Sequence, residues 1–194
     1  MNIQSNMKKN NRLVILAHPR KESFNHKIAK TIVNNSDSVF LMDLYNKKWK
    51  QDFLEFQDEK KDWPDNKVFK KIREKIEWAD ELIFVYPVWW TGEPAILKNF
   101  IDINFSAGFA FKYEDGKPTG LLGEKNARVF TTADSPKWLM TFLHPFMKMV
   151  FSKAVLDFCG IKTLSFNIFA DMSRNRSSDY RNKILKKVVR VLGK

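Results

Sequence analysis

Cysteine is almost absent from this chain of 194 residues, in which Cys159 stands alone. A single thiol excludes a disulfide within the chain and suits a reducing compartment, so we expect a cytoplasmic protein. The three histidines and Cys159 show no metal-ligand spacing, so we expect no bound metal. No run of about 18 apolar residues occurs, and the polar N-terminus lacks the apolar core of a signal peptide. We therefore expect neither stable membrane insertion nor secretion.

Glycine motifs that bind phosphate are also missing. No G-x-G-x-x-G follows the first expected strand, and no Walker sequence occurs anywhere in the chain. These motifs bring the backbone close to a pyrophosphate or a triphosphate. Their absence argues against a dinucleotide held in the Rossmann manner and against a nucleoside triphosphate.

The net charge is strongly positive, at +12. Such a charge fits a surface for nucleic acid, an anionic membrane or a phosphorylated ligand, and it equally fits a lysine-rich solvated surface. The lysines are spread over every segment and alternate with acidic residues over 55–75, and no nucleic-acid-binding module accompanies them. We favour the solvated surface and expect no nucleic-acid partner.

Short apolar runs alternate with helical patterns along the chain, which is typical of parallel βαβ units. Strands are expected at 12–17, 39–43, 81–86, 127–132 and 162–170, and helices at 24–34, 65–78, from 94, at 138–158 and from 178. Residues 45–65 form a long charged excursion, and the helix at 138–158 is expected to be interrupted or kinked at Pro145 and capped by Gly160. We predict one α/β domain over residues 1–194, a doubly wound five-stranded parallel sheet with helices on both faces. The right-handed crossover rule favours the flavodoxin-like strand order 2-1-3-4-5.

The most informative segment follows the third expected strand. Its turn holds Pro87, Val88, Trp89, Trp90 and Gly92 at the carboxyl end of a strand, where open α/β sheets bind ligands. A turn requires glycine or proline, but it does not require two adjacent tryptophans. Planar apolar rings in that place suit a large planar ligand, with a flavin ring as the leading candidate. The alternative is that the two rings fill the core or a subunit interface.

The loop after the first expected strand, 18–25, leads into a helix N-terminus. Free backbone N–H groups and the helix dipole favour an anion there. His18, Ser23 and Asn25 add side-chain donors, and Arg20 and Lys21 add positive charge. A terminal phosphate fits this loop, and the missing glycine motifs then favour a flavin mononucleotide. The alternative is that Ser23 only caps the helix.

The loop after the fourth expected strand begins with Thr131, Thr132, Ala133 and Asp134. A tight turn with exposed N–H groups suits the pyrimidine edge of a flavin, where negative charge develops on reduction. The alternative is an ordinary turn before a helix.

With these loops identified, the chain resembles the NAD(P)H:quinone oxidoreductases of the flavodoxin-like superfamily, in their short bacterial-type branch. The matching segments spread over most of the chain in the family's order. They are 16–25 (LAHPRKESFN), 84–102 (FVYPVWWTGEPAILKNFID), 108–113 (GFAFKY), 131–136 (TTADSP) and 158–161 (FCGI).

The resemblance implies a homodimeric flavoenzyme that works by ping-pong hydride transfer. NAD(P)H would reduce FMN, or alternatively FAD, and a quinone or similar acceptor would then take two electrons in the same pocket. On this sequence the resemblance implies phosphate binding by His18, Ser23, Phe24 and Asn25. It places the flavin ring against Pro87, Val88, Trp89 and Trp90, with Thr131, Thr132, Ala133 and Asp134 at its other edge.

The family pattern is not complete in this chain. Ala133 and Asp134 stand where members with well-marked quinone pockets often have two glycines. Leu139 stands near a tyrosine position of the family, and His144 is the nearest histidine, so no catalytic residue is assigned. Two other functions stay open: a flavodoxin-type electron carrier, and a regulatory subunit of a glutathione-gated potassium-efflux system, with or without enzyme activity.

Aromatic residues also gather in and after the helix that starts at Pro94. Phe100, Phe105, Phe109 and Phe111 exceed what one helix buries beneath itself, so we expect some of them to face a second copy of the chain. A two-fold dimer is the commonest closed assembly of one chain type. We expect the interface to complete the acceptor pocket.

Overall fold

The parallel sheet at the centre of the protein has the predicted strand order. The computed structural model describes residues 10–57, 63–173 and 176–193. Its central sheet has five strands in the order β2-β1-β3-β6-β7, and all neighbouring pairs are parallel. Their bounds are β1 Arg12–Leu16, β2 Val39–Asp43, β3 Glu81–Pro87, β6 Asn126–Thr132 and β7 Lys162–Phe169. All five predicted strands are confirmed, and the order is flavodoxin-like.

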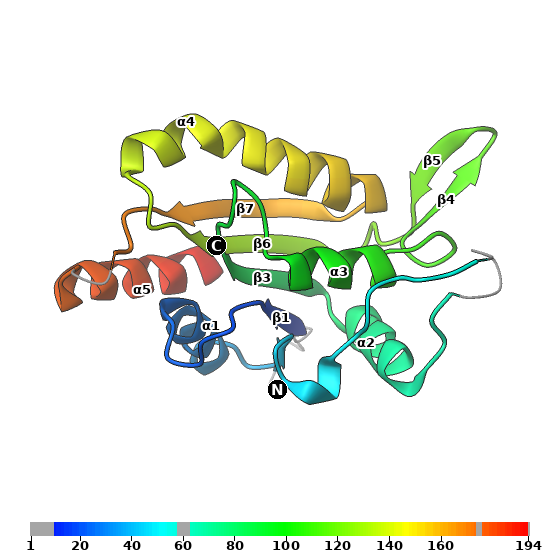
Figure 1. The fold of residues 1–194 in the computed structure, drawn as a ribbon, viewed down its shortest axis with the longest axis horizontal. Coiled ribbons are helices and arrows are strands. Elements are labelled where there is room, and N and C mark those ends of the chain that lie inside the picture. Colours follow the sequence, from blue (N-terminus) through cyan, green and yellow to red (C-terminus); the bar gives the residue numbers. More distant parts are fainter. Residues whose placement is uncertain (1–9, 58–62, 174–175, 194) are drawn as a thin grey trace, which may run out of the picture.

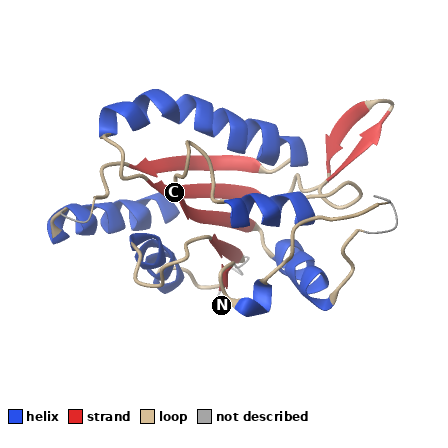
Figure 2. Cartoon of the chain, in the orientation of Figure 1, coloured by secondary structure: helices blue, strands red, loops and turns tan. Residues whose placement is uncertain are grey.

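Helices cover both faces of the sheet, as Figures 1 and 2 show. α1 (Phe24–Asn34) and α5 (Ser178–Leu192) pack on one face. α2 (Lys67–Trp78), α3 (Ala95–Asn104) and α4 (Lys137–Lys148) pack on the other. Side-chain caps begin three of these helices, with Ser23 before α1, Asn66 before α2 and Ser177 before α5.

The long excursion between β2 and α2 begins with one short helical turn, η1 (Lys47–Trp49). Trp49 is buried there, and its ring lies 5.7 Å from that of Phe40. Residues 58–62 of the predicted excursion lie outside the described residues.

The core has two layers because successive side chains of each strand point to opposite faces. Leu13, Ile15, Phe84 and Val129 join the layer under α2, α3 and α4. Val14, Leu16, Val85 and Phe130 join the layer under α1 and α5. A strand buried on both faces requires a continuous apolar run, which is the pattern that revealed β1 and β3 in the sequence.

A small antiparallel hairpin lies outside the central sheet and was not predicted. It consists of β4 (Phe111–Glu114) and β5 (Lys117–Gly120). Most of its side chains are exposed, and its sequence signal is short: Phe111 and Tyr113 alternate with polar residues before the Asp115-Gly116 turn. Its base packs against the end of the α4 segment, where a Cβ on Gly120 would lie only 2.2 Å from the Gly160 nitrogen.

The segment after β6 is a single long helical stretch whose geometry changes along its length. α4 continues through Pro145, so the helix is not interrupted there, and the kink that was the other form of the expectation stays a prediction. A π-helix, η2 (Met149–Leu156), and a short 3-10 turn, η3 (Asp157–Cys159), then follow, and Gly160 ends the stretch at φ 83° as predicted. Lys137–Cys159 is long and apolar enough to cross a membrane by length and composition alone, and 28% of its apolar window is buried in the protein. The sequence reasoning had found no such segment.

A buried ionic cluster joins three strands at their amino ends. Glu81 on β3 is 1% exposed and accepts from Arg12 Nε on β1 at 2.9 Å. It also pairs with Arg128 on β6, which is itself buried. The cluster lies at the edge opposite the loops that carry the predicted site residues.

Candidate functional site

The three loops with the predicted site residues lie next to one another at the carboxyl edge of the sheet. They follow β1, β3 and β6, which are neighbours in the sheet. Hydrogen bonds link them directly: Asn25 Nδ2 donates to Thr132 Oγ1 at 2.8 Å, and Val88 N donates to Thr132 O at 2.7 Å. Thr132 therefore connects the first loop to the third and the third to the second.

The turn after β3 is closed tightly and has an unusual backbone. Trp89 and Gly92 exchange two backbone hydrogen bonds of 2.9 and 3.0 Å. The two residues between them have positive φ angles, 50° at Trp90 and 63° at Thr91. Asparagine and glycine are the usual residues in such a turn, whereas a β-branched residue there is strained. Strain of this kind gathers at ligand-binding sites.

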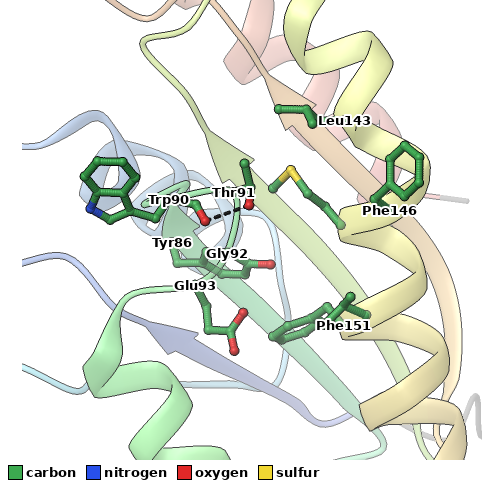
Figure 3. A pocket seen from close by; sticks show the side chains of 10 residues that line it. Tyr86, Trp90, Thr91, Gly92, Glu93, Leu143, Phe146 and Phe151 are labelled. Carbon is green, nitrogen blue, oxygen red and sulfur yellow. Dashed lines mark hydrogen bonds between the residues drawn. The ribbon is translucent and has the colours of Figure 1, made fainter.

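The turn exposes both tryptophan rings. The exposed fraction of Trp90 is 101%, and that of Trp89 is 43%. Neither ring fills the core of this chain, which removes one of the two alternatives raised from the sequence. In Figure 3 the Trp90 indole points away from the α4 side chains, beyond the turn.

An apolar cavity of about 230 Å³ lies between this turn and the α4 segment. Tyr86, Thr91, Gly92 and Glu93 line it from the β3 side, and the opposite wall comes from the α4 segment (Figure 3). The wall consists of Leu143, Phe146, Met147, Val150 and Phe151. The sequence analysis missed this wall.

The loop after β1 holds the predicted phosphate ligands, but two of them already have internal partners. Ser23 is 1% exposed and caps α1, since its Oγ accepts from His26 N at 3.3 Å. Its Oγ also lies 2.9 Å from His26 Nδ1. Ser23 therefore acts as a helix cap, and Asn25 binds Thr132. The buried Oδ1 of Asn25 has no hydrogen-bond partner among the described residues.

A polar cavity of about 310 Å³ lies beside this loop. Basic side chains from three places surround it: Arg20 from the loop, Lys27 from α1 and Arg181 from α5. His18 and Phe24 line it as well, Glu22 adds a carboxylate from the first loop, and Asp134 adds one from the loop after β6. The first and third loops thus share a hollow at the N-terminus of α1 with three basic and two acidic side chains.

His18 is held as a neutral donor beside this hollow. Its Nδ1 accepts from Arg20 N at 3.0 Å, which leaves Nε2 to carry the ring proton. Partial burial lowers the pKa of His18, and the nearby His26 and Arg20 lower it further.

The loop after β6 offers fewer free groups than predicted. Thr131 Oγ1 donates to Tyr86 O at 2.8 Å, and Ala133 N donates to Phe169 O at 2.9 Å. Asp134 is exposed. The Ala133 N–H is therefore not exposed for a ligand.

The two residues near the family's tyrosine and histidine positions do not line the apolar cavity. Leu139 packs in a small cluster with Ala133 and Met140. His144 lies 3.2 Å from Phe166 O through its Nε2, on the side of α4 that faces β7. Neither residue is placed to exchange a proton in the cavity.

The predicted interface aromatics are mostly inside the protein. Phe100 and Phe105 are buried, so only the other two of the four aromatics could face a partner. Phe109 and Phe111 are half-buried. A group of exposed apolar side chains lies on the α4 segment, and we call it the α4 stripe: Trp138, Phe142, Phe146, Met149 and Val150, each 55–72% exposed.

Three features of the site fit a flavin mononucleotide. The polar hollow at the α1 N-terminus has the charge for a terminal phosphate. The apolar cavity and the exposed tryptophans flank the adjacent loop and suit a planar ring. The unpartnered Asn25 Oδ1 lies between the two regions, next to Thr132.

Comparison with known proteins finds one matching family and several similar proteins. A family model described as having a flavodoxin-like fold matches residues 10–192. An uncharacterized NAD(P)H oxidoreductase of Haemophilus influenzae is 31% identical over 172 residues, covering 84% of each chain. An FMN-dependent NADH:quinone oxidoreductase of Clostridium beijerinckii is 30% identical over 166 residues, covering 77% of this chain and 79% of that protein. The crystal structure of Smu.1420 from Streptococcus mutans superposes with a TM-score of 0.79 and 34% identity, covering 93% of this chain and 97% of that one.

Proposed function

The chain belongs to this family of proteins with a flavodoxin-like fold, and we propose that it is a flavin-dependent NAD(P)H oxidoreductase that reduces a quinone or a similar acceptor. The observation that carries the proposal is the apolar cavity beside the strained tryptophan turn, at the carboxyl edge of the sheet. The names of the relatives from Haemophilus influenzae and Clostridium beijerinckii support the same class of reaction.

FMN is the cofactor that we propose, with NAD(P)H as the co-substrate. His18, Phe24 and Asn25 would hold the phosphate end with the N-terminus of α1, whereas Ser23 would shape the loop as its helix cap. Pro87, Val88, Trp89 and Trp90 would lie against the ring, and Thr131, Thr132, Ala133 and Asp134 would border its other edge. A bound flavin would supply the hydride chemistry itself.

The side chains of this protein then have three tasks. The tryptophan turn orients planar groups, and the apolar wall of the α4 segment keeps water out of the cavity. The α1 N-terminus and the basic side chains around the hollow hold negative charge in place. No side chain in the cavity is needed as a proton donor for hydride transfer, and none is assigned.

We propose a ping-pong order, in which NAD(P)H and the acceptor use the apolar cavity in turn. One cavity serves both substrates because the structure has a single apolar hollow bordering the tryptophan turn in the part of the chain that it describes. Double-reciprocal plots of rate against NAD(P)H should be parallel at several quinone concentrations. Intersecting lines would contradict the shared cavity.

The direct test of the proposal is the colour of the purified protein. We expect it to carry visible flavin absorbance that NADPH bleaches anaerobically and menadione restores. A protein that binds FMN but is not bleached by NADPH or NADH would fit an electron carrier instead. A protein that does not bind added FMN would remove the proposal.

We also propose that the protein is a homodimer formed through the α4 stripe. Large exposed apolar patches mark sites of interaction. In a two-fold dimer the α4 stripes of the two copies would pack against each other in an antiparallel pair. Phe146 and Val150 belong both to the stripe and to the cavity wall. A second copy on the stripe would therefore enclose the cavity, as expected from the sequence, although the residues differ. A cytoplasmic location, expected from the single buried Cys159, stays a prediction.

A further inference from the structure

A second apolar cavity lies away from the loops at the carboxyl edge of the sheet. It has a volume of about 660 Å³ and lies between α2 and the segment that follows α3. Trp63, Phe69, Phe105 and Phe111 are among its walls, and it shares no lining residue with the cavity beside the tryptophan turn. Glu93 of the first cavity precedes α3, whereas Asp102 and Phe105 of the second lie at its end, so the two cavities lie at opposite ends of the helix.

Arg73 of α2 supplies the positive charge in this cavity. Its guanidinium carbon lies 4.2 Å from the ring centre of Phe69 and 4.4 Å from that of Phe109. One terminal nitrogen donates to Ser106 Oγ, in the segment after α3. The rings and the serine hold the planar group in one orientation, which suits bidentate pairing with a carboxylate.

The hydrogen-bonding capacity of this arginine is not used up. Its Nε is buried without a hydrogen-bond partner, and no carboxylate pairs with it among the described residues. The indole nitrogen of Trp63, on the cavity wall, is also buried without a partner in the described part of the chain. Burial lowers the pKa of Arg73, although Glu77 opposes that shift. Arg73 is partly exposed toward the cavity, and a ligand carboxylate there would give its guanidinium a directly bonded anion.

The acidic residues at the rim limit the charge of such a ligand. Asp65 pairs with Lys70 at 3.2 Å, and Asp102 pairs with Lys98. Within each pair the two charges offset each other. Arg73 is therefore the one unpaired cation among the described lining residues. A single carboxylate matches the one unpaired positive charge of Arg73, whereas a multiply charged anion such as a phosphate would exceed it.

We propose that this cavity binds an organic monocarboxylate with an aromatic body. The carboxylate pairs with the terminal nitrogens of the Arg73 guanidinium, and the ring lies among Trp63, Phe69, Phe105 and Phe111. The site goes beyond the reductase function and does not depend on it, since no residue is shared between the two cavities.

Titration calorimetry of the purified protein with phenylacetate tests the proposal, and phenylacetamide is the uncharged control of the same shape. We expect one phenylacetate to bind per chain, about ten- to hundredfold more tightly than phenylacetamide, because the hydrogen bonds to Arg73 are charge-assisted. Equal affinity for the two compounds, no binding of phenylacetate, or equal binding of inorganic phosphate would overturn it.

Two variants locate the site. Arg73→Gln should reduce phenylacetate affinity to that of phenylacetamide while leaving menadione reduction unchanged. Lys71→Gln removes the same charge from an exposed position of α2 and should leave phenylacetate binding as it is. If Arg73→Gln does not fold, NMR of the unaltered protein tests the site through the Arg73 Nε–H signal. That signal should shift with phenylacetate and not with phenylacetamide, and an unchanged signal would overturn the proposal.

Discussion

The backbone of Thr91 is the most strained position in the candidate site. A β-branched residue at a φ of 63° is held where an L-residue pays about 1–2 kcal/mol. Strained backbone of this kind is found at ligand-binding sites. The shape of this turn therefore serves binding and not stability.

Replacing Thr91 by glycine should therefore stabilise the protein. We expect the free energy of unfolding to rise by about 1 kcal/mol, because glycine adopts positive φ without steric cost. Urea denaturation measures the change. Thr141→Gly in α4 is the matched control, and it should lower stability because glycine is a poorer helix former than threonine. A loss of stability in Thr91→Gly as large as that of the control would show that the turn is not strained.

His18 should make stability depend on pH in the mildly acid range. Its pKa in the folded protein is lowered, so the unfolded chain binds the proton more readily. Stability from His18 is therefore fully present above its unfolded pKa, about 6.5, and is lost as the pH falls below that value. We expect His18→Gln to lose less stability than the unaltered protein between about pH 7 and about pH 5.

The comparison is made by urea unfolding of both proteins at each pH. His144→Gln, which leaves His18 intact, should follow the unaltered protein. An identical slope in His18→Gln and the unaltered protein would show that His18 is not the group responsible.

Single residues were the hardest part of the site to predict. The sequence placed Ser23 and Asn25 correctly at the start of α1, but it could not show that both side chains bind partners inside the protein. A serine before a helix is both a cap and a possible anion ligand, and the choice depends on how His26 is oriented. Trp90 was easier, because two adjacent tryptophans in a turn have few structural uses.

At the scale of elements, the buried strands were predicted and the hairpin was overlooked. β1 and β3 are apolar on both faces, so their sequences contain one uninterrupted signal. The signal of β4 and β5 is shorter: Phe111 and Tyr113 alternate with polar residues, and Asp115 and Gly116 form the two-residue turn at positive φ. The wall that the α4 segment adds to the cavity was missed for another reason. The segment is apolar on two faces, and periodicity cannot tell which face meets the sheet.

The junction between the hairpin and the α4 segment depends on Gly120. A side-chain carbon there would meet backbone atoms of Cys159 and Gly160 at 2.2–2.7 Å, and backbone cannot move aside as a flexible side chain does. We expect Gly120→Ala to lower the free energy of unfolding by about 1–3 kcal/mol, in the range of overpacked positions. Gly116→Ala in the tip of the same hairpin meets no neighbouring atom within 4 Å, so it tests the backbone conformation alone. Thermal unfolding of the two variants should show the larger loss for Gly120→Ala.

At the scale of the whole molecule, the two edges of the sheet have separate tasks. Arg12, Glu81 and Arg128 join three strands at the amino edge, away from solvent. The same three strands end at the candidate site on the carboxyl edge. At the amino edge, buried ion pairs hold the strands together. The carboxyl edge has instead a strained turn, two exposed tryptophan rings and the unpartnered Oδ1 of Asn25.

The assembly of two molecules is the last feature that the chain leaves exposed. Phe142 is 66% exposed at the centre of the α4 stripe and does not line the apolar cavity. Phe142→Asp should give monomers of 22.9 kDa by sedimentation, whereas the unaltered protein should sediment at twice that mass. A charge buried in an interface without a partner is costly enough to separate the copies.

The monomeric variant should still bind FMN, because all three loops belong to one chain, but it should lose most menadione reduction because the cavity wall at Phe146 and Val150 opens to water. Val189→Asp on α5, another exposed apolar position, is the control and should stay dimeric and active. The stripe would be excluded as the interface if Phe142→Asp stayed dimeric. An unaltered protein that sediments as a monomer at micromolar concentration would exclude the dimer itself. A fully active Phe142→Asp monomer would show that catalysis does not need the dimer and that one chain forms the complete cavity.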